Sequence, residues 1–176
     1  MISKESNMET FELKKGDIFC TRNPMALGRA INFVQKIKSK DNKAEYSHSG
    51  IIMHEDGMTF EALWTNKRQN LFTDYQGRKV LIGRHKGMTD AKFQLGWNGI
   101  KKHEGKWYAG HRLIFFLIPF AAKYINLGLG VCSELTMKFL YKAKLADAWK
   151  SWNPDDVADM IKKWKDYEII YEGKIE

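Results

Sequence analysis

The stretch Tyr46-Ser-His-Ser-Gly-Ile-Ile-Met-His-Glu-Asp-Gly-Met-Thr-Phe-Glu-Ala-Leu-Trp64 decides how the centre of the chain folds. It contains two apolar segments, residues 47–53 and 58–64, which flank the turn-forming pair Asp56-Gly57. Such a pair between apolar segments is a strong hairpin signal, because both residues tolerate the left-handed backbone of tight turns. We therefore predict two neighbouring antiparallel strands.

His48 and Glu61 are the residues of this hairpin that point to chemistry. A carboxylate in an apolar strand is costly to bury unless it is paired. In a hairpin, the residue numbers of each directly opposed pair add up to the same value. A sum of 109 would place His48 and Glu61 directly opposite each other, and a sum of 111 would make them diagonal neighbours. A two-residue Asp56-Gly57 turn gives 113 and separates them by about four residues, whereas an odd loop puts them on opposite faces. A site that uses both needs a longer loop or another turn.

Cys132 lies in the segment Gly128-Leu-Gly-Val-Cys-Ser-Glu-Leu-Thr136, where it follows a glycine loop and opens a predicted helix. The unpaired N–H groups and the dipole at a helix start stabilise a thiolate. The same N–H groups, including that of Cys132, could hold a developing oxyanion. The alternative is a small buried core residue. Cys20 follows a strand pattern with no helix start beside it, and we predict that it belongs to the core.

These three residues suggest a nucleophilic site. Cys132 would attack a carbonyl, His48 would take the thiol proton and deliver it to the leaving group, and Glu61 would orient the imidazole. The alternative for His48 is a structural histidine. The small residues Ser49 and Gly50 beside it leave space around the ring, as a substrate groove would need.

The rest of the chain predicts an α+β fold with a mostly antiparallel sheet, in a single domain over residues 1–176 with a flexible terminus at 1–10. Asn153-Pro154-Asp155-Asp156 is a strong helix start, with a capping residue, proline at the first position and acids at the positive dipole end. The other predicted elements are strands at 18–21, 80–84 and 167–171, helices from Asn23, at 90–102, at 133–144 and from Asn153 to about 165, a charged loop at 36–43, and a buried helix or helix pair at 113–127.

Five short motifs follow one another in the order of a known family: Lys15-Gly-Asp-Ile-Phe19, Tyr46-Ser-His-Ser-Gly-Ile-Ile52, Phe60-Glu-Ala62, Val131-Cys-Ser-Glu-Leu135 and Pro154-Asp-Asp-Val-Ala158. With them the chain resembles the circularly permuted branch of the NlpC-type papain-like cysteine hydrolases, the YiiX/YebB-like proteins, which are related to the lecithin retinol acyltransferase fold. The resemblance implies a papain-like fold, Cys132 as nucleophile, His48 as base and Glu61 as the orienting residue. It also implies hydrolysis of an amide or ester through an acyl-enzyme.

Composition narrows the function classes further. Hydrophobic residues make up 44% and charged residues 28%, which excludes a disordered chain. The net charge of +8 suits an anionic partner such as a membrane surface, a cell-wall polymer or nucleic acid, although we find no nucleic-acid-binding motif. The longest apolar run, residues 113–122, is too short to span a bilayer, and no signal peptide precedes the polar start, so we expect a cytoplasmic protein.

We therefore expect a cysteine hydrolase that cleaves an amide bond in a peptide, an amino-acid amide or a cell-wall peptide. One alternative is a lipid acyl hydrolase or acyltransferase with the same triad, because residues 113–122 could cover an acyl-binding groove. Another is an inactive binding module on the same fold. We expect neither a metal nor another cofactor, since the sequence has no metal-ligand cluster. The other histidines, which we expect to be surface or packing residues, are His54, His85, His103 and His111.

Overall fold

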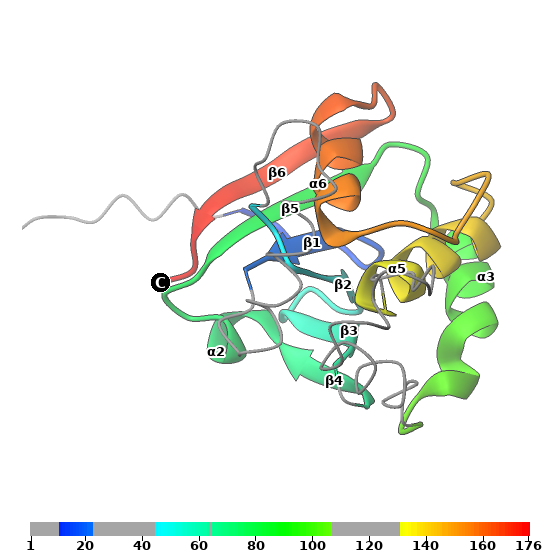
Figure 1. Ribbon diagram of the computed structural model, residues 1–176, viewed down its shortest axis with the longest axis horizontal. Coiled ribbons are helices and arrows are strands. Elements are labelled where there is room, and N and C mark those ends of the chain that lie inside the picture. Colours follow the sequence, from blue (N-terminus) through cyan, green and yellow to red (C-terminus); the bar gives the residue numbers. More distant parts are fainter. Residues whose placement is uncertain (1–10, 23–44, 64, 107–130) are drawn as a thin grey trace, which may run out of the picture.

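The computed structural model describes residues 11–22, 45–63, 65–106 and 131–176. Its centre is a six-stranded sheet in the order β4-β3-β2-β1-β5-β6, in which every neighbouring pair is antiparallel (Figure 1). The strands are β1 (Ile18–Thr21), β2 (His48–Ile52), β3 (Met58–Ala62), β4 (Asn66–Asn70), β5 (Lys79–His85) and β6 (Tyr167–Lys174). The helices are α2 (Leu71–Asp74), α3 (Asp90–Ile100), the 3-10 helix η1 (Lys101–His103), α5 (Val131–Lys142) and α6 (Pro154–Lys163). The described part of the chain is thus α+β, as predicted.

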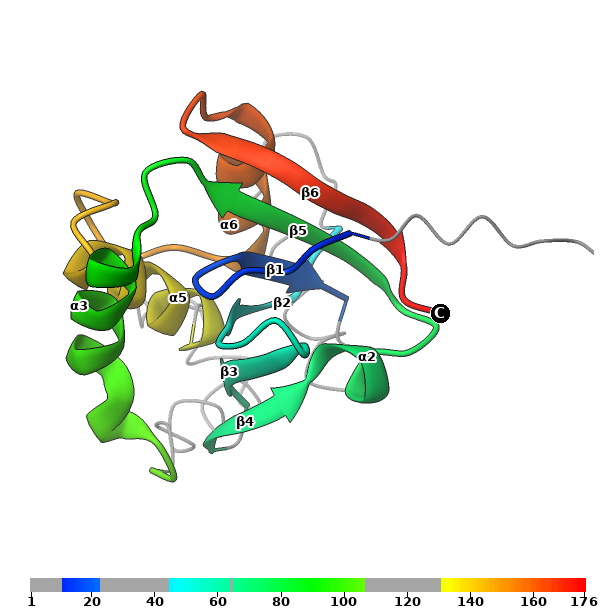
Figure 2. The same cartoon turned by 180° about the vertical axis from the view of Figure 1, so that it is seen from behind.

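Helices α5 and α6 pack on one face of the sheet, and α3 packs beside α5 (Figures 1 and 2). Strand side chains on this face, among them Ile18 and Ile51, form the larger apolar core with the helices. A smaller core around Phe19 and Ile82 covers the opposite face. Because successive side chains of a strand alternate between faces, the central strands are buried on both sides.

The turn between β2 and β3 is longer than a two-residue turn centred on Asp56-Gly57, as a site that uses both His48 and Glu61 requires. It spans residues 54–57: the Met53 N–H donates to Met58 O at 2.7 Å, and the Gly57 N–H donates to His54 O at 3.2 Å. Gly57 has φ +88°, in the left-handed region that favours glycine. The Asp56 carboxylate accepts the Met58 N–H at 2.9 Å and fixes the exit of the turn. The longer turn changes the register of the hairpin.

In that register Gly50 pairs with Glu61, so His48 and Glu61 are diagonal neighbours on one face. A Cβ atom at Gly50 would lie 2.8 Å from Glu61 Cγ and 2.5 Å from Phe19 Cε1. Glycine is therefore required here because the Glu61 side chain crosses over it. The space beside His48 that the sequence suggested for a substrate is taken by Glu61 and Phe19.

Most predicted elements occur close to their predicted bounds. Strand β1 agrees at both ends, α3 ends at Ile100 before the short η1, and β6 runs on to Lys174. The side chain of Asn153 caps α6 in a capping box, as predicted. Strand β4 and helix α2 have no predicted counterpart, because Asn66–Asn70 is a polar strand at the edge of the sheet.

Four predictions fall outside the described residues: the terminus at 1–10, the helix from Asn23, the loop at 36–43, and the apolar helix or helix pair at 113–127. The single-domain organisation stays a prediction. Within the described ranges, no helix is long and apolar enough to cross a membrane.

Candidate active site

His48 and Glu61 form a buried pair beside the rings of Phe19 and Tyr75. His48 is the first residue of β2, and its Nε2 lies 2.6 Å from Glu61 Oε2. The two residues are 2% and 0% exposed. An ionised carboxylate can only accept a hydrogen bond, so Nε2 carries the proton and Nδ1 is the ring nitrogen left for another partner. This is the arrangement in which a carboxylate orients an imidazole.

Two hydroxyl groups also donate to the Glu61 carboxylate. Thr59 Oγ1 donates to Oε1, and Tyr75 OH donates to Oε2, the oxygen that His48 also binds. Thr59 is on the same face of β3, and Tyr75 is the residue that ends α2. The sequence analysis missed both residues. The signal was the buried acid itself, since a carboxylate inside an apolar strand requires donors.

Cys132, the second residue of α5, interacts with His48 from the other side. Burial raises the pKa of the Cys132 thiol, but the charge and hydrogen bonding of His48 and the backbone N–H groups of Ser49 and Ser133 lower it below its ordinary value. Burial lowers the pKa of His48, but Cys132 and Glu61 raise it to about 10. Both directions favour a thiolate paired with an imidazolium. The structure thus brings the three predicted residues together.

Cys20 is a core residue, as predicted. It is fully buried in β1, where its Sγ donates to Pro154 O at 3.9 Å. Burial, and then the charge of Cys132, raise the pKa of Cys20 well above its ordinary value. Its thiol therefore stays protonated at neutral pH.

Two motifs that support the family resemblance have anchoring roles. Asp155 Oδ1, in the first turn of α6, accepts the backbone N–H groups of Tyr46 at 2.8 Å and Glu45 at 3.1 Å. These contacts fix the chain that leads into His48. Asp17 is buried at the start of β1 and pairs with Arg84 of β5 at 2.8 Å. Both contacts are structural, since each one ties a strand of the site to another element.

The remaining histidines of the described residues lie away from this site. His54 is exposed in the β2–β3 turn beside Asp56, and His85 packs edge-on against Tyr167. His103 contacts Lys138. His111 falls outside the described ranges. Over those ranges, no group of three or more His, Cys, Asp or Glu side chains could hold a metal ion.

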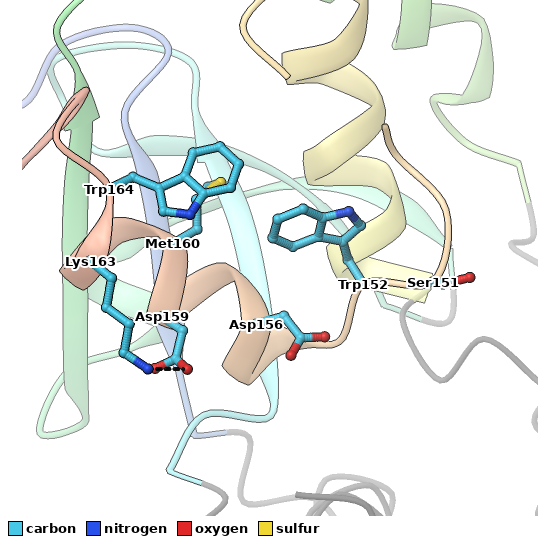
Figure 3. A pocket seen from close by; sticks show the side chains of 7 residues that line it. All are labelled: Ser151, Trp152, Asp156, Asp159, Met160, Lys163 and Trp164. Carbon is cyan, nitrogen blue, oxygen red and sulfur yellow. Dashed lines mark hydrogen bonds and ion pairs between the residues drawn. The ribbon is translucent and has the colours of Figure 1, made fainter. Parts of the chain in front are cut away.

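A separate pocket of about 310 Å³ opens beside α6. Figure 3 shows Trp152 and Trp164 on its two sides. Their ring centroids are 6.0 Å apart. Ser133, the residue after Cys132, donates to Trp152 O at 2.6 Å. The pocket is lined by Ser151, Trp152, Asp156, Asp159, Met160, Lys163 and Trp164, so it includes none of the three candidate catalytic residues.

Comparison with solved structures shows a fold similar to that of the metalloprotein YiiX from Escherichia coli O157:H7. The match has a TM-score of 0.61 and 15% sequence identity, and it covers 93% of this chain and 99% of the YiiX chain. No protein-family model matches the chain. A search of curated proteins likewise finds no match. The likeness therefore concerns the fold, over nearly the whole of both chains.

Proposed function

We propose that this protein is a cysteine hydrolase that cleaves an amide bond. The observation that carries the proposal is the line of contacts from Cys132 through His48 to Glu61, with the pKa of the thiol lowered and that of the imidazole raised. A nucleophile, a base and an orienting carboxylate in contact are the parts of a catalytic triad.

In the proposed reaction the Cys132 thiolate attacks the carbonyl carbon and forms a C–S bond, and the carbonyl oxygen takes the negative charge. Backbone N–H groups at the start of α5, including that of Cys132, would stabilise this oxyanion. The imidazolium of His48 gives its proton to the leaving amine as the C–N bond breaks. His48 then takes a proton from water, which attacks the acyl-enzyme and releases the acid and the thiolate.

The family that we propose for this chain is the circularly permuted branch of the papain-like hydrolases. Its support is the chain order, in which the histidine strand β2 precedes the cysteine helix α5, together with the fold shared with YiiX. The cytoplasm remains the proposed location, and an anionic surface a proposed partner.

YiiX is described as a metalloprotein, which raises the question of a metal in this chain. A catalytic zinc site uses three protein ligands. Here Glu61 and His48 Nε2 bind each other, which leaves Cys132 and His48 Nδ1 as the donors among the described residues of the site. With no larger donor cluster in the described residues, this site does not fit a metal, and no step is assigned to one.

Peptide or amino-acid amides are the first proposed substrates, because the motif resemblance is strongest to hydrolases of that kind. The lipid acyl alternative rests on residues 113–122, outside the described part of the chain. The lowered thiol pKa beside a raised imidazole pKa favours an active enzyme over an inactive module.

The test is a panel of fluorogenic peptide amides, amino-acid amides and acyl esters, assayed with the unmodified protein, Cys132→Ala and the matched control Cys20→Ala. We expect hydrolysis of at least one amide by the protein and by Cys20→Ala, and none by Cys132→Ala. Turnover of acyl esters alone would favour the lipid reading. Full activity of Cys132→Ala would refute the mechanism.

A further inference from the structure

Tyr75 touches both the carboxylate and the imidazole of the candidate site. Its hydroxyl donates to Glu61 Oε2, and its ring is stacked on the His48 ring at an interplanar angle of 16° with centroids 6.3 Å apart. The residue is 3% exposed and comes from the segment between α2 and β5, so it reaches the site from outside the β2–β3 hairpin.

The hydroxyl of Tyr75 acts as a hydrogen-bond donor over the whole working pH range. Burial, and then the charge of Glu61, raise the pKa of Tyr75 far above its ordinary value. The phenol therefore keeps its proton beside a carboxylate that has no solvent to bind. The hydroxyl is therefore a constant hydrogen-bond donor to Glu61 Oε2.

The two hydroxyls on Glu61 differ in what they can control. Thr59 binds Oε1, which faces away from the imidazole contact, whereas Tyr75 binds the same oxygen as His48. Of the two hydroxyls, Tyr75 is therefore the one that fixes the oxygen to which His48 Nε2 is hydrogen-bonded. A free Oε2 could rotate away from His48 and let the ring turn its Nδ1 away from Cys132.

We propose that Tyr75 is a positioning residue of the Cys132–His48–Glu61 site, which holds Glu61 Oε2 in place so that the His48 imidazole stays oriented toward Cys132. This inference rests on the proposed function, because it assigns Tyr75 a part in activating the same thiol. Tyr75 contacts no reacting atom and acts through Glu61.

The substitution Tyr75→Phe isolates this role. It keeps the ring that packs on Phe19 at a centroid distance of 5.4 Å and on His48, and removes only the hydroxyl. Thr59→Val is the matched control, since it removes the other hydroxyl from the same carboxylate with little change of shape. Both variants leave Cys132 and His48 unchanged.

The experiment measures the rate of Cys132 alkylation by iodoacetamide between pH 4 and 10, resolved by peptide mass spectrometry, which requires no known substrate. Thermal unfolding is recorded for each variant. In Tyr75→Phe we expect the pH midpoint of Cys132 alkylation to rise by about one unit, so that the alkylation rate below this midpoint falls about tenfold. In Thr59→Val we expect a smaller rise of the midpoint. Hydrolysis in Tyr75→Phe should lose kcat with little change in KM.

An unchanged midpoint in Tyr75→Phe, or an equal shift in Thr59→Val, would overturn the role of Tyr75. If the unmodified protein has the midpoint of an ordinary thiol, the proposed function fails instead. If Tyr75→Phe does not fold, 3-fluorotyrosine at position 75 keeps the packing and donates more strongly. The pH midpoint of Cys132 alkylation must then move, and an unchanged value would contradict the proposal.

Discussion

Cys132 and Cys20 belong to one apolar core, yet their thiols have opposite surroundings. Cys132 lies at the start of α5, beside the His48 imidazole and the N–H groups of Ser49 and Ser133, and its pKa is lowered although burial alone would raise it. Cys20 lies within β1, where a carbonyl is its hydrogen-bond partner, and its pKa is raised. Burial is common to both, so the neighbours decide which thiol reacts.

The backbone explains the difference. In β1, Cys20 pairs with Ser49 on one side and Leu81 on the other, so its strand is hydrogen-bonded on both edges. A helix start leaves N–H groups without intrahelical partners, and these can turn toward a negative charge. Removing the neighbours of Cys132 one at a time tests whether they cause this difference between the two thiols.

Removal of the imidazole should have the largest effect. In His48→Ala the Cys132 thiol keeps its burial but loses its partner, so its pKa returns to about 8.5 or higher. We expect the alkylation rate of Cys132 at pH 6.5 to fall roughly 100-fold, because about 1% of such a thiol is ionised there. Cys20 provides the internal control, and a Cys132 rate unchanged by His48→Ala would show that the imidazole does not activate it.

Loss of the anchor at the start of β2 should have a smaller effect. Asp155→Ala removes the acceptor of the Tyr46 and Glu45 N–H groups, and we expect a loss of about 1–2 kcal/mol in the free energy of unfolding. Reactivity of Cys132 should fall only a few-fold, because His48 keeps its other contacts. Chemical denaturation measures the stability. Asp155→Asn, which keeps an acceptor oxygen, should recover most of it, and an Asp155→Ala variant as stable as the parent would refute the anchoring role.

Much of this site could be predicted from the sequence, because its elements carry local signals. The glycine loop before Cys132 marks a helix start, and the apolar strands around His48 and Glu61 mark a hairpin. The register could not be predicted, since it depends on a turn set by the hydrogen bonds of His54 and Asp56.

The hydrogen-bond partners of Glu61 could not be predicted from the sequence for a different reason. Tyr75 follows the short helix α2, and β4 before it is polar and lies at the sheet edge, so neither element has a clear periodic pattern. Tertiary contacts alone bring the tyrosine to the carboxylate. A buried acid in a sequence is thus evidence for donors, but it does not say where along the chain they lie.

The smallest effect on reactivity is expected from Cys20→Ala. The substitution empties part of a fully buried position and should cost about 1 kcal/mol of stability. The pH midpoint of Cys132 alkylation should stay the same within error, because Cys20 only senses the charge of Cys132. A shifted midpoint in Cys20→Ala would mean that the ionisation of the two thiols is coupled. It would contradict the account in which the neighbours of each thiol set its pKa separately.

The pH dependence of alkylation at both cysteines of the unmodified protein tests the central claim most directly. Absolute rates also depend on access, so the midpoint is the quantity to compare. Because the folded pKa of Cys132 is lowered, its rate should hold a plateau below the ordinary thiol value of about 8.5 and fall only in more acid solution, as pH drops through the lowered pKa. Cys20 should stay unreacted across this range. A Cys132 midpoint at or above about 8.5 would contradict an activated nucleophile at this site.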